Sequence, residues 1–333
     1  MAEAQDPPPL PPGMFTSNGP GLHFFAGWLG ATVSCVLLSP LEVLKTKQQS
    51  SAFRHLGAGR LAAQIWRAEG AAGFYRGLVP HLAGVGPARA LYFGGYRWCK
   101  ERLPARTGLS GRYLDFIAGA AAMIASATIM SPLWVVKTRF QLQPSVPGAP
   151  PMYAGMADAF RQVYRREGLP AFYRGLSASY LGVAETALQF ALYGELKERR
   201  TAARLAALRA EAAAGARPPL PAAPAELARL AYDDGSAFWT SAASKLVAAV
   251  VTYPHEVLRT RMREATPPAA PGAPGGGAAQ PPRYTGLRQS VALILREEGV
   301  RGLYGGMTVH LLRTVPNAAV LVLVVEKITG GAV

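Results

Sequence analysis

Long runs of apolar residues, separated by shorter polar stretches, dominate the pattern of the chain. Residues 116–136 carry no Asp, Glu, Lys or Arg, and the stretch from Pro7 to Leu41 carries none either. A helix of about 20 apolar residues is long enough to cross the hydrocarbon core of a bilayer. Both stretches therefore predict membrane-spanning helices.

Four further apolar segments are each interrupted by a single charged residue. They are residues 77–96 with Arg89, 175–194 with Glu185, 236–254 with Lys245, and 307–325 with Arg313. Buried helices of a large soluble protein would show the same pattern, so hydropathy by itself leaves both interpretations open.

An internal repeat favours the membrane interpretation. Pro40, Pro132 and Pro254 begin the stretches PLEVLKTKQQ, PLWVVKTRFQ and PHEVLRTRMR. Each is followed by a second part, which reads EGAAGFYRG at 69–77, EGLPAFYRG at 167–175 and EGVRGLYGG at 298–306. Three copies of one two-part motif are far beyond chance, and each copy has an apolar segment on either side. The apolar segments therefore form six expected helices, two in each copy.

The expected long helices lie near residues 22–50, 76–103, 113–143, 174–200, 236–264 and 304–329. Three shorter segments, LAAQIWRAE, MADAFRQVYRRE and LRQSVALILREE, have a helical period and charges suited to an interface. Two insertions rich in Ala, Pro and Gly lie near 201–232 and 266–282. An Ala/Leu/Arg stretch in the first could form a helix, and a solvated insertion is favoured there over a regulatory element.

The net positive charge of the chain limits the classes of ligand that it could bind. The formal net charge is +15, although only 17% of residues are charged. A positive excess is typical of proteins that bind nucleic acid, anionic lipid or an anionic small molecule. Nucleic acid is disfavoured because the positive residues are spread through the apolar repeats. The N-terminus has no Arg-rich amphipathic stretch, so no cleaved transit peptide is expected.

Catalytic and metal chemistry finds little support in the sequence. Two cysteines rule out a disulfide scaffold and a four-cysteine zinc site. The five histidines are scattered, and there is neither a nucleophile–base motif nor a phosphate-binding P-loop. We therefore expect no enzyme, no cofactor and no metal.

The two-part motif resembles the signature of the mitochondrial carrier family, in which Pro-x-acid-x-x-base-x-base precedes acid-Gly-x4-aromatic-base-Gly. The resemblance covers nearly the whole chain. It implies an all-α protein of the mitochondrial inner membrane, monomeric, with six tilted transmembrane helices in three pseudo-symmetric repeats around a central cavity. Three short helices would lie on the matrix side, and both termini would face the intermembrane space. The implied division is a disordered segment 1–21, repeats 22–108, 109–200 and 236–333, and a cytosol-side insertion 201–235.

The resemblance implies a gate on the matrix side, closed by ion pairs between the odd-numbered helices. A proline inside a spanning helix kinks it, so Pro40, Pro132 and Pro254 would bend these helices inward. The expected pairs are Glu42 with Lys137 and Lys45 with Glu256. The family's bracing glutamine falls at Gln49 and Gln141, and Arg263 replaces it in the third copy.

The second copy departs from this pattern because Trp134 occupies the acidic position. Arg259 then lacks its carboxylate, and the Trp134 face offers it a cation–π contact worth roughly 0.5–2 kcal/mol. The gate is expected to hold two ion pairs rather than three.

The opposite, cytosolic gate retains few of the family's charges. Its expected members are Lys100, Lys197 and Glu326. Only Glu326 is an acid at the position where the family has one, and it is expected to pair with Lys100. Repeated glycines at helix starts suggest phosphate sites, because exposed N–H groups at a helix N-terminus bind phosphate, and the resemblance to the carrier family implies that cardiolipin binds there. The expected lipid-binding residues are Gly57, Tyr75, Arg76, Gly77, Gly155, Tyr173, Arg174, Gly175, Gly286 and Gly306.

Aligning the even-numbered helices on their starting glycines brings Gly84-Val85, Gly182-Val183 and Arg313 to one level, where the family contacts its substrates. A glycine followed by a branched residue opens a flat slot for a planar base, and an arginine fork suits phosphate oxygens. The simplest pose places phosphates at Arg313 and the base against Gly182-Val183. Further substrate-binding candidates are Arg89, Glu185 and Lys245, although Lys245 could pair with Glu185 instead.

Several stretches resemble the pyrimidine nucleotide carriers within this family. They are PLW, YPHEV-x-RTR-x-RE, GV-x-P-x-RA-x-YF, FYRG-x-SASY-x-G-x-x-ET, and REEG-x-x-x-LY with HL-x-R-x-x-PN. A neighbouring branch that carries NAD, FAD or folates shares PLW and YPHEV, so these two motifs do not decide. Arg261, Arg263, Glu264 and the stretch SASY-x-G-x-x-ET favour the pyrimidine branch. The expected activity is nucleotide exchange by alternating access, with the neighbouring branch as the alternative.

Overall fold

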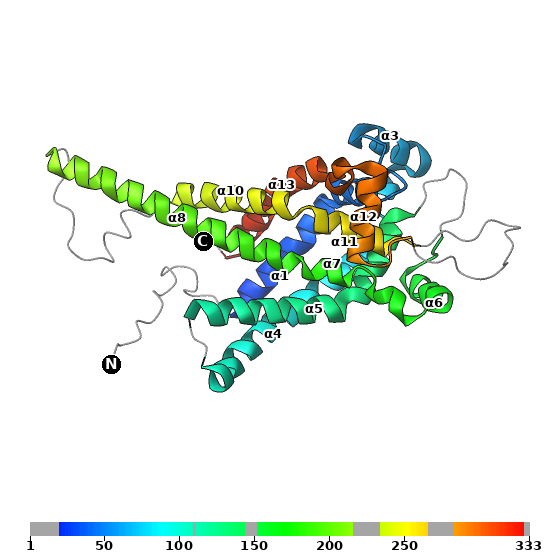
Figure 1. Ribbon diagram of the computed structural model, residues 1–333, viewed down its shortest axis with the longest axis horizontal. Coiled ribbons are helices and arrows are strands. Elements are labelled where there is room, and N and C mark those ends of the chain that lie inside the picture. The colour runs from blue at the N-terminus through cyan, green and yellow to red at the C-terminus, as the bar shows by residue number, and fades with distance from the viewer. Residues whose placement is uncertain (1–19, 109–110, 144–151, 216–233, 266–282, 330–333) are drawn as a thin grey trace, which may run out of the picture. The chain divides into compact units, whose positions relative to one another are not determined.

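A computed structural model describes residues 20–108, 111–143, 152–215, 234–265 and 283–329, and every regular element in these ranges is a helix (Figure 1). The chain divides into two compact units, one from Met1–Tyr180 with Pro254–Val333 and the other from Leu181–Tyr253. Each unit is described here by itself.

The first unit holds the long helices α1 (Pro20–Leu37), α4 (Leu78–Thr107), α5 (Gly111–Leu142) and α13 (Met307–Thr329). Its shorter helices are α2 (Ser39–Gln49), α3 (Ala58–Glu69), α6 (Met156–Glu167), α7 (Leu176–Tyr180), α11 (Pro254–Arg263) and α12 (Leu287–Glu298). Three 3₁₀ turns follow the motif acids at Gly70–Tyr75, Leu169–Tyr173 and Val300–Tyr304. Helix α1 packs along α13, and α4 packs along α5.

The second unit is a pair of helices, α8 (Gly182–Ala213) and α10 (Asp234–Thr252), which run side by side (Figure 1). Arg200 of α8 donates a hydrogen bond to the Thr240 hydroxyl of α10 over 2.6 Å. Helix α8 extends well past residue 200, where the sequence suggested an end, so residues 201–213 of the expected insertion 201–235 are helical. Residues 216–233 and the expected N-terminal segment through residue 19 lie outside the described ranges.

Only part of the described chain passes a test of length and hydropathy for membrane spans. The helical stretch Tyr113–Leu142 passes alone, and Gly27–Leu37 with Ser39–Gln49 pass together across a bend of 64°. The other long helices are interrupted by charges such as Arg89 and Arg313, as their sequences indicated.

The motif prolines coincide with helix breaks in two of the three copies. The expected helix 22–50 divides at Leu38 before Pro40, and 236–264 divides at Tyr253 before Pro254. Helix α5, in contrast, continues through Pro132. A third break, at Leu181 between α7 and α8, was not expected from the sequence.

A serine before the proline ties the first two copies to their own 3₁₀ turns. The Ser39 hydroxyl donates to the Phe74 carbonyl over 3.1 Å, and the Ser131 hydroxyl donates to the Phe172 carbonyl over 2.8 Å. A proline leaves a backbone carbonyl unpaired, and polar groups near such a site must find partners within the protein. These bonds join the two parts of each motif.

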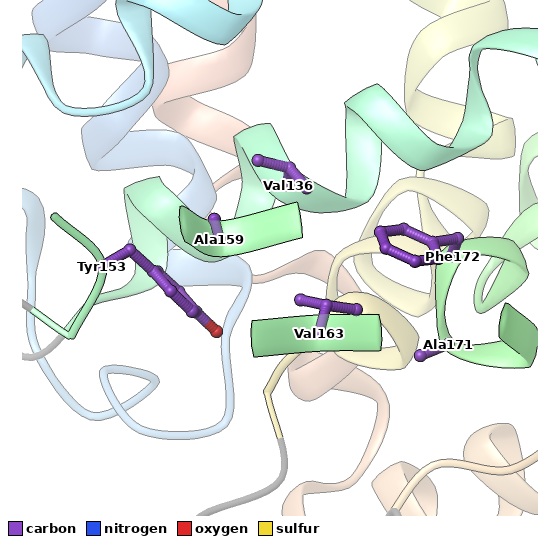
Figure 2. Close-up of a cluster of buried hydrophobic side chains, with 6 residues drawn as sticks. All are labelled: Val136, Tyr153, Ala159, Val163, Ala171 and Phe172. Atoms are coloured by element: carbon purple, nitrogen blue, oxygen red, sulfur yellow. The ribbon is translucent and has the colours of Figure 1, made fainter. Parts of the chain in front are cut away.

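The short helices α3, α6 and α12 pack by two positions one turn apart. Leu61 and Ile65 of α3 are fully buried, as are Ser290 and Ile294 of α12. In the second copy, Ala159 and Val163 of α6 join Val136 of α5 with Tyr153, Ala171 and Phe172 (Figure 2). This spacing puts one apolar stripe on each helix and leaves the rest of its surface polar.

The glycines that precede α4 and α7 allow neighbouring copies to approach closely. Gly77 has φ +78°, and a Cβ there would lie 3.1 Å from the Lys137 carbonyl oxygen. Gly175 has φ +76°, and a Cβ there would lie 2.9 Å from the Arg259 carbonyl oxygen. Any other residue would be strained in this left-handed region and would also clash with the adjacent helix. Both contacts join one copy to the next.

Within each motif copy, an ion pair joins the first part of the motif to the second part. The second base of the first part meets the acid of the second part, in the pairs Lys47–Glu69, Arg139–Glu167 and Arg261–Glu298. The second copy shows good geometry, since two nitrogens of the Arg139 guanidinium donate to the two oxygens of Glu167. The acid is also paired with Arg76 in the first copy and Arg174 in the second.

The third copy has Gly305 where the others have this additional arginine. A Cβ at Gly305 would lie 2.9 Å from the Gln48 carbonyl oxygen, so the close approach of α2 leaves no room for a side chain. Arg54, from the loop after α2, supplies the missing cation and donates to Glu298 over 2.7 Å. Burial alone would raise the pKa of Glu298, but hydrogen bonds from Arg261 and Arg54 lower the pKa below its ordinary value.

Replacing Arg54 with alanine is expected to destabilise the contact between the first and third copies. A loss of about 1 kcal/mol corresponds to a fall in the melting temperature of about 2–4 °C, measurable by thermal unfolding in detergent. Arg60→Ala, an exposed position on α3, is the matched control and should melt as wild type.

The same variant carries a pH signature. The folded-state pKa of Glu298 is depressed, so its ion-pair stabilisation is present above the ordinary carboxyl pKa and is lost as pH falls through the depressed value. The melting difference should therefore persist at neutral pH and shrink in acid. If Arg54→Ala and wild type melt at the same temperature at neutral pH, Arg54 does not take the role of the missing arginine.

Candidate functional site

The converging ends of α2, α5 and α11 carry a cluster of buried charges. Lys45 Nζ lies 2.7 Å from Glu256 Oε2, and Lys137 pairs with Glu42. The side chains of all four residues are at most 14% exposed. Both expected ion pairs therefore form, one between the first and third motif copies and one between the first and second.

Arg259 does not contact Trp134 as the sequence suggested. Its guanidinium pairs with Glu256, three residues earlier on α11. The correction has a simple cause: Glu256 has two oxygens, so one accepts from Lys45 and the other from Arg259. A residue three positions away on the same helix is a ready neighbour.

The cation over the Trp134 ring is Lys137, with Nζ 5.5 Å from the ring centre. Residues 134 and 137 lie three apart on α5, so the stacked lysine is again a local neighbour. His81 of α4 meets the indole edge-on, with ring centres 6.0 Å apart and planes at 76°. Trp134 therefore faces the first motif copy.

Glu42 contacts more side chains than its expected partner Lys137. Its Oε2 lies 3.3 Å from Arg313 of α13 and 3.4 Å from His81 Nδ1. The other ring nitrogen of His81 lies 3.7 Å from the Cys35 sulfur. The cluster is thus larger than the two ion pairs that the sequence led us to expect, and no spacing signal linked His81 or Cys35 to it.

The expected bracing glutamines contact threonines of the next helix. The Thr260 hydroxyl of α11 donates to Gln49 Oε1 over 2.7 Å, and the Thr46 hydroxyl of α2 donates to Gln141 Oε1 over 3.0 Å. In the third copy, Arg263 donates to the Ser179 hydroxyl of α7 over 3.1 Å. These contacts form a second layer of bonds between copies.

The helix level at which we expected the substrate to bind is partly filled by side chains. Gly84 is buried, and a Cβ there would lie 2.8 Å from Trp134 Cη2 and 2.9 Å from Leu133 Cδ2. The expected slot at Gly84 is therefore filled by a side chain of α5, while the adjacent Val85 is half-buried. Arg89 donates to the Gly27 carbonyl of α1 over 3.1 Å, which gives it a structural partner.

The remaining expected substrate residues belong to the second unit. Gly182, Val183 and Glu185 lie in the first turn of α8, and Lys245 lies in the middle of α10.

At the far end of α4, Lys100 pairs with Asp115 of α5 over 2.7 Å, and Tyr96 donates to the same carboxylate. Asp115, which the motif comparison did not single out, is therefore a partner of Lys100, and the expected pairing of Lys100 with Glu326 stays a prediction. Lys197 lies in α8, and the side chain of Glu326 lies outside the described part of the structure.

The expected lipid-binding residues fall into three groups. Gly57, Gly155 and Gly286 precede α3, α6 and α12, and a Cβ at any of them would meet nothing within 4 Å. Tyr75 and Tyr173 are exposed, whereas Arg76 and Arg174 are engaged by the motif acids. Gly77 and Gly175 pack against neighbouring helices, and Gly306 has φ +76°.

The cluster has an excess of positive charge. Four cations, Lys45, Lys137, Arg259 and Arg313, share the two carboxylates of Glu42 and Glu256. Charges in a low-dielectric interior must be paired or face water. An arrangement with more cations than carboxylates attracts an anion, and Arg313 adds a planar fork suited to phosphate or carboxylate oxygens.

Comparison with known proteins identifies the family. The profile of the mitochondrial carrier protein family matches residues 17–107, 111–202 and 234–331. Solute carrier family 25 member 36 of Gallus gallus is 34% identical over 92% of this chain and 96% of its own length. Solute carrier family 25 member 33 of Homo sapiens is 35% identical over 92% and 94%, and mitochondrial carrier protein rim2 of Schizosaccharomyces pombe is 33% identical over 90% and 86%. The chain belongs to the mitochondrial carrier family and is a multi-pass protein of the mitochondrial inner membrane.

Proposed function

We propose that this carrier exchanges pyrimidine nucleotides across the inner membrane by alternating access. The observation that carries the proposal is the Arg313 guanidinium, set in a cluster where cations outnumber carboxylates. The stretches around Gly84, Ser177 and Arg313 add the resemblance to pyrimidine nucleotide carriers. Similarity to solute carrier family 25 members 36 and 33 along nearly the whole chain supports the same assignment.

In this proposal each motif copy contributes two spanning helices. The pairs are α1–α2 with α4, α5 with α7–α8, and α10–α11 with α13, and the short helices α3, α6 and α12 lie on the matrix side. Charges that interrupt the apolar segments, such as Arg89 and Arg313, then face a central cavity rather than lipid. Cardiolipin binds at the open helix starts that follow Gly57, Gly155 and Gly286.

The buried cluster acts as the matrix gate. Its ion pairs join α2 to α5 and α2 to α11, so they close the matrix side when all three helices converge. Opening toward the matrix separates these helices and breaks both pairs. At the cytosolic side, Lys100, Lys197 and Glu326 remain the proposed gate residues.

A nucleotide engages this gate through Arg313. In the closed arrangement Arg313 pairs with Glu42, and phosphate oxygens compete with that carboxylate for the guanidinium. Binding therefore exchanges one charge-assisted contact for another and weakens the hold on Glu42. The activity is transport, and the chain's own residues need no cofactor for it.

The substrate class is tested by exchange in liposomes. Purified carrier reconstituted with internal UTP is expected to take up labelled UTP, CTP or TTP, and to take up little when the vesicles are empty. Heat-denatured carrier supplies the control. Exchange of NAD or folate without any exchange of pyrimidine nucleotides would assign the chain to the neighbouring branch.

The gate is tested by a charge swap. Lys45→Glu and Glu256→Lys should each impair exchange, because each leaves like charges in the closed cluster. The double variant should recover part of the loss, with a coupling of about 0.5–3 kcal/mol when the rates are converted to free energies. A double variant as inactive as the worse single variant would contradict the pairing.

Substrate binding at Arg313 is tested by two substitutions at that position. Arg313→Ala removes one charge-assisted contact of about 1.5–3 kcal/mol, so nucleotide affinity should fall roughly 10- to 150-fold. Arg313→Lys keeps the charge without the planar fork and should also transport poorly. Leu312→Ala, at an exposed neighbour on α13, is the control. Near-wild-type exchange by Arg313→Ala would exclude Arg313 as a ligand.

A further inference from the structure

The contacts of Trp134 resemble those that a flat aromatic ligand would make. One part of its ring lies against Gly84, where a Cβ would come within 3.0 Å of Cζ3 and 2.8 Å of Cη2. The ammonium of Lys137 lies over the ring, and the imidazole of His81 meets its edge. A glycine floor, a cation over the ring and a polar edge are the features that bind a nucleobase.

The site of the Trp134 ring lies next to Arg313, the residue proposed to bind phosphate. His81 and Arg313 both contact Glu42 Oε2, at 3.4 Å and 3.3 Å. The indole and the guanidinium therefore flank the same carboxylate–imidazole pair. A nucleotide whose phosphates replace Glu42 at Arg313 would direct its base toward Gly84.

We infer that Trp134 occupies the nucleobase slot of the carrier when no substrate is bound, and that an incoming pyrimidine takes its place against Gly84. This inference rests on the proposed function, and it replaces the expected pose in which the base lies against Gly182-Val183. Trp134 is then a specificity-determining residue, because a ligand must supply a flat ring to displace the indole.

Displacement of the indole also reaches the gate. Lys137 lies over Trp134 and pairs with Glu42, so moving the ring removes one of the two contacts of the Lys137 ammonium. The phosphates meanwhile draw Arg313 away from Glu42. The base thus weakens the contact of Glu42 with Lys137, and the phosphates weaken its contact with Arg313. An anion without a base weakens only the contact with Arg313.

The test compares a nucleotide with pyrophosphate in Gly84→Ala. The added methyl group fills the slot, so the concentration of UTP that half-inhibits exchange should rise by a factor at least about tenfold larger than the factor for pyrophosphate, which feels only the displaced indole. Gly94→Ala is the matched control, because it lies on the same helix with nothing within 4 Å of the added atom. If UTP and pyrophosphate shift by the same factor, or neither shifts, the inference is wrong.

Tryptophan fluorescence gives a second readout that does not depend on the Gly84 variant. UTP should change the emission of wild type and of Trp66→Phe, whose Trp66 is 62% exposed on α3, but not that of Trp134→Phe. An unchanged UTP response in Trp134→Phe would overturn the inference. Failure of wild type to exchange any pyrimidine nucleotide would instead overturn the proposed function, so the two failures are distinguishable.

Discussion

A charge inside a membrane protein is tolerated only when another group of the protein, or water, compensates it. Glu42 is the place where this constraint concentrates. One carboxylate serves Lys137, Arg313 and His81, which come from three different helices. Every helix whose side chain contacts this carboxylate must bring that side chain to the same point. The convergence of α2, α4, α5 and α13 is therefore dictated by a shortage of negative charge as much as by apolar packing.

The same shortage would let the proposed gate open reversibly. A buried ion pair in which each charge has one exclusive partner is costly to break, because both charges are left unpaired. A cluster with four cations and two carboxylates accepts an external anion as an additional partner. An anionic substrate can therefore take over part of the cluster while the remaining charges stay compensated.

Departures from the repeated motif are compensated by other charges of the cluster or of another copy. Trp134 replaces an acid, and Glu256 then accepts from both Lys45 and Arg259. Gly305 replaces an arginine because the Gln48 carbonyl approaches too closely, and Arg54 from the first copy then pairs with Glu298. Arg259 finds its carboxylate within the third copy, whereas Glu298 takes its second cation from the first copy, so the contacts between copies are asymmetric even though the motif is repeated.

The sequence by itself determined the repeat and most of the helices. Helix positions follow from apolar length and from the motif prolines and glycines, which act over a few residues. The pairs Glu42–Lys137 and Lys45–Glu256 were implied by the resemblance of the repeated motif to the carrier family, and both form in the structure.

Only the tertiary structure decided which partner each charge takes and which spaces stay open. Arg259 and Lys137 are equally available to Trp134 in a sequence, but the direction of the indole toward Gly84 selects Lys137. Lys100 meets Asp115, which no motif singled out, because α4 packs along α5. The contacts of Cys35, His81 and Arg54 likewise join residues far apart in the chain. Such contacts depend on side-chain direction between helices, and that direction is set by packing rather than by any local pattern of residues.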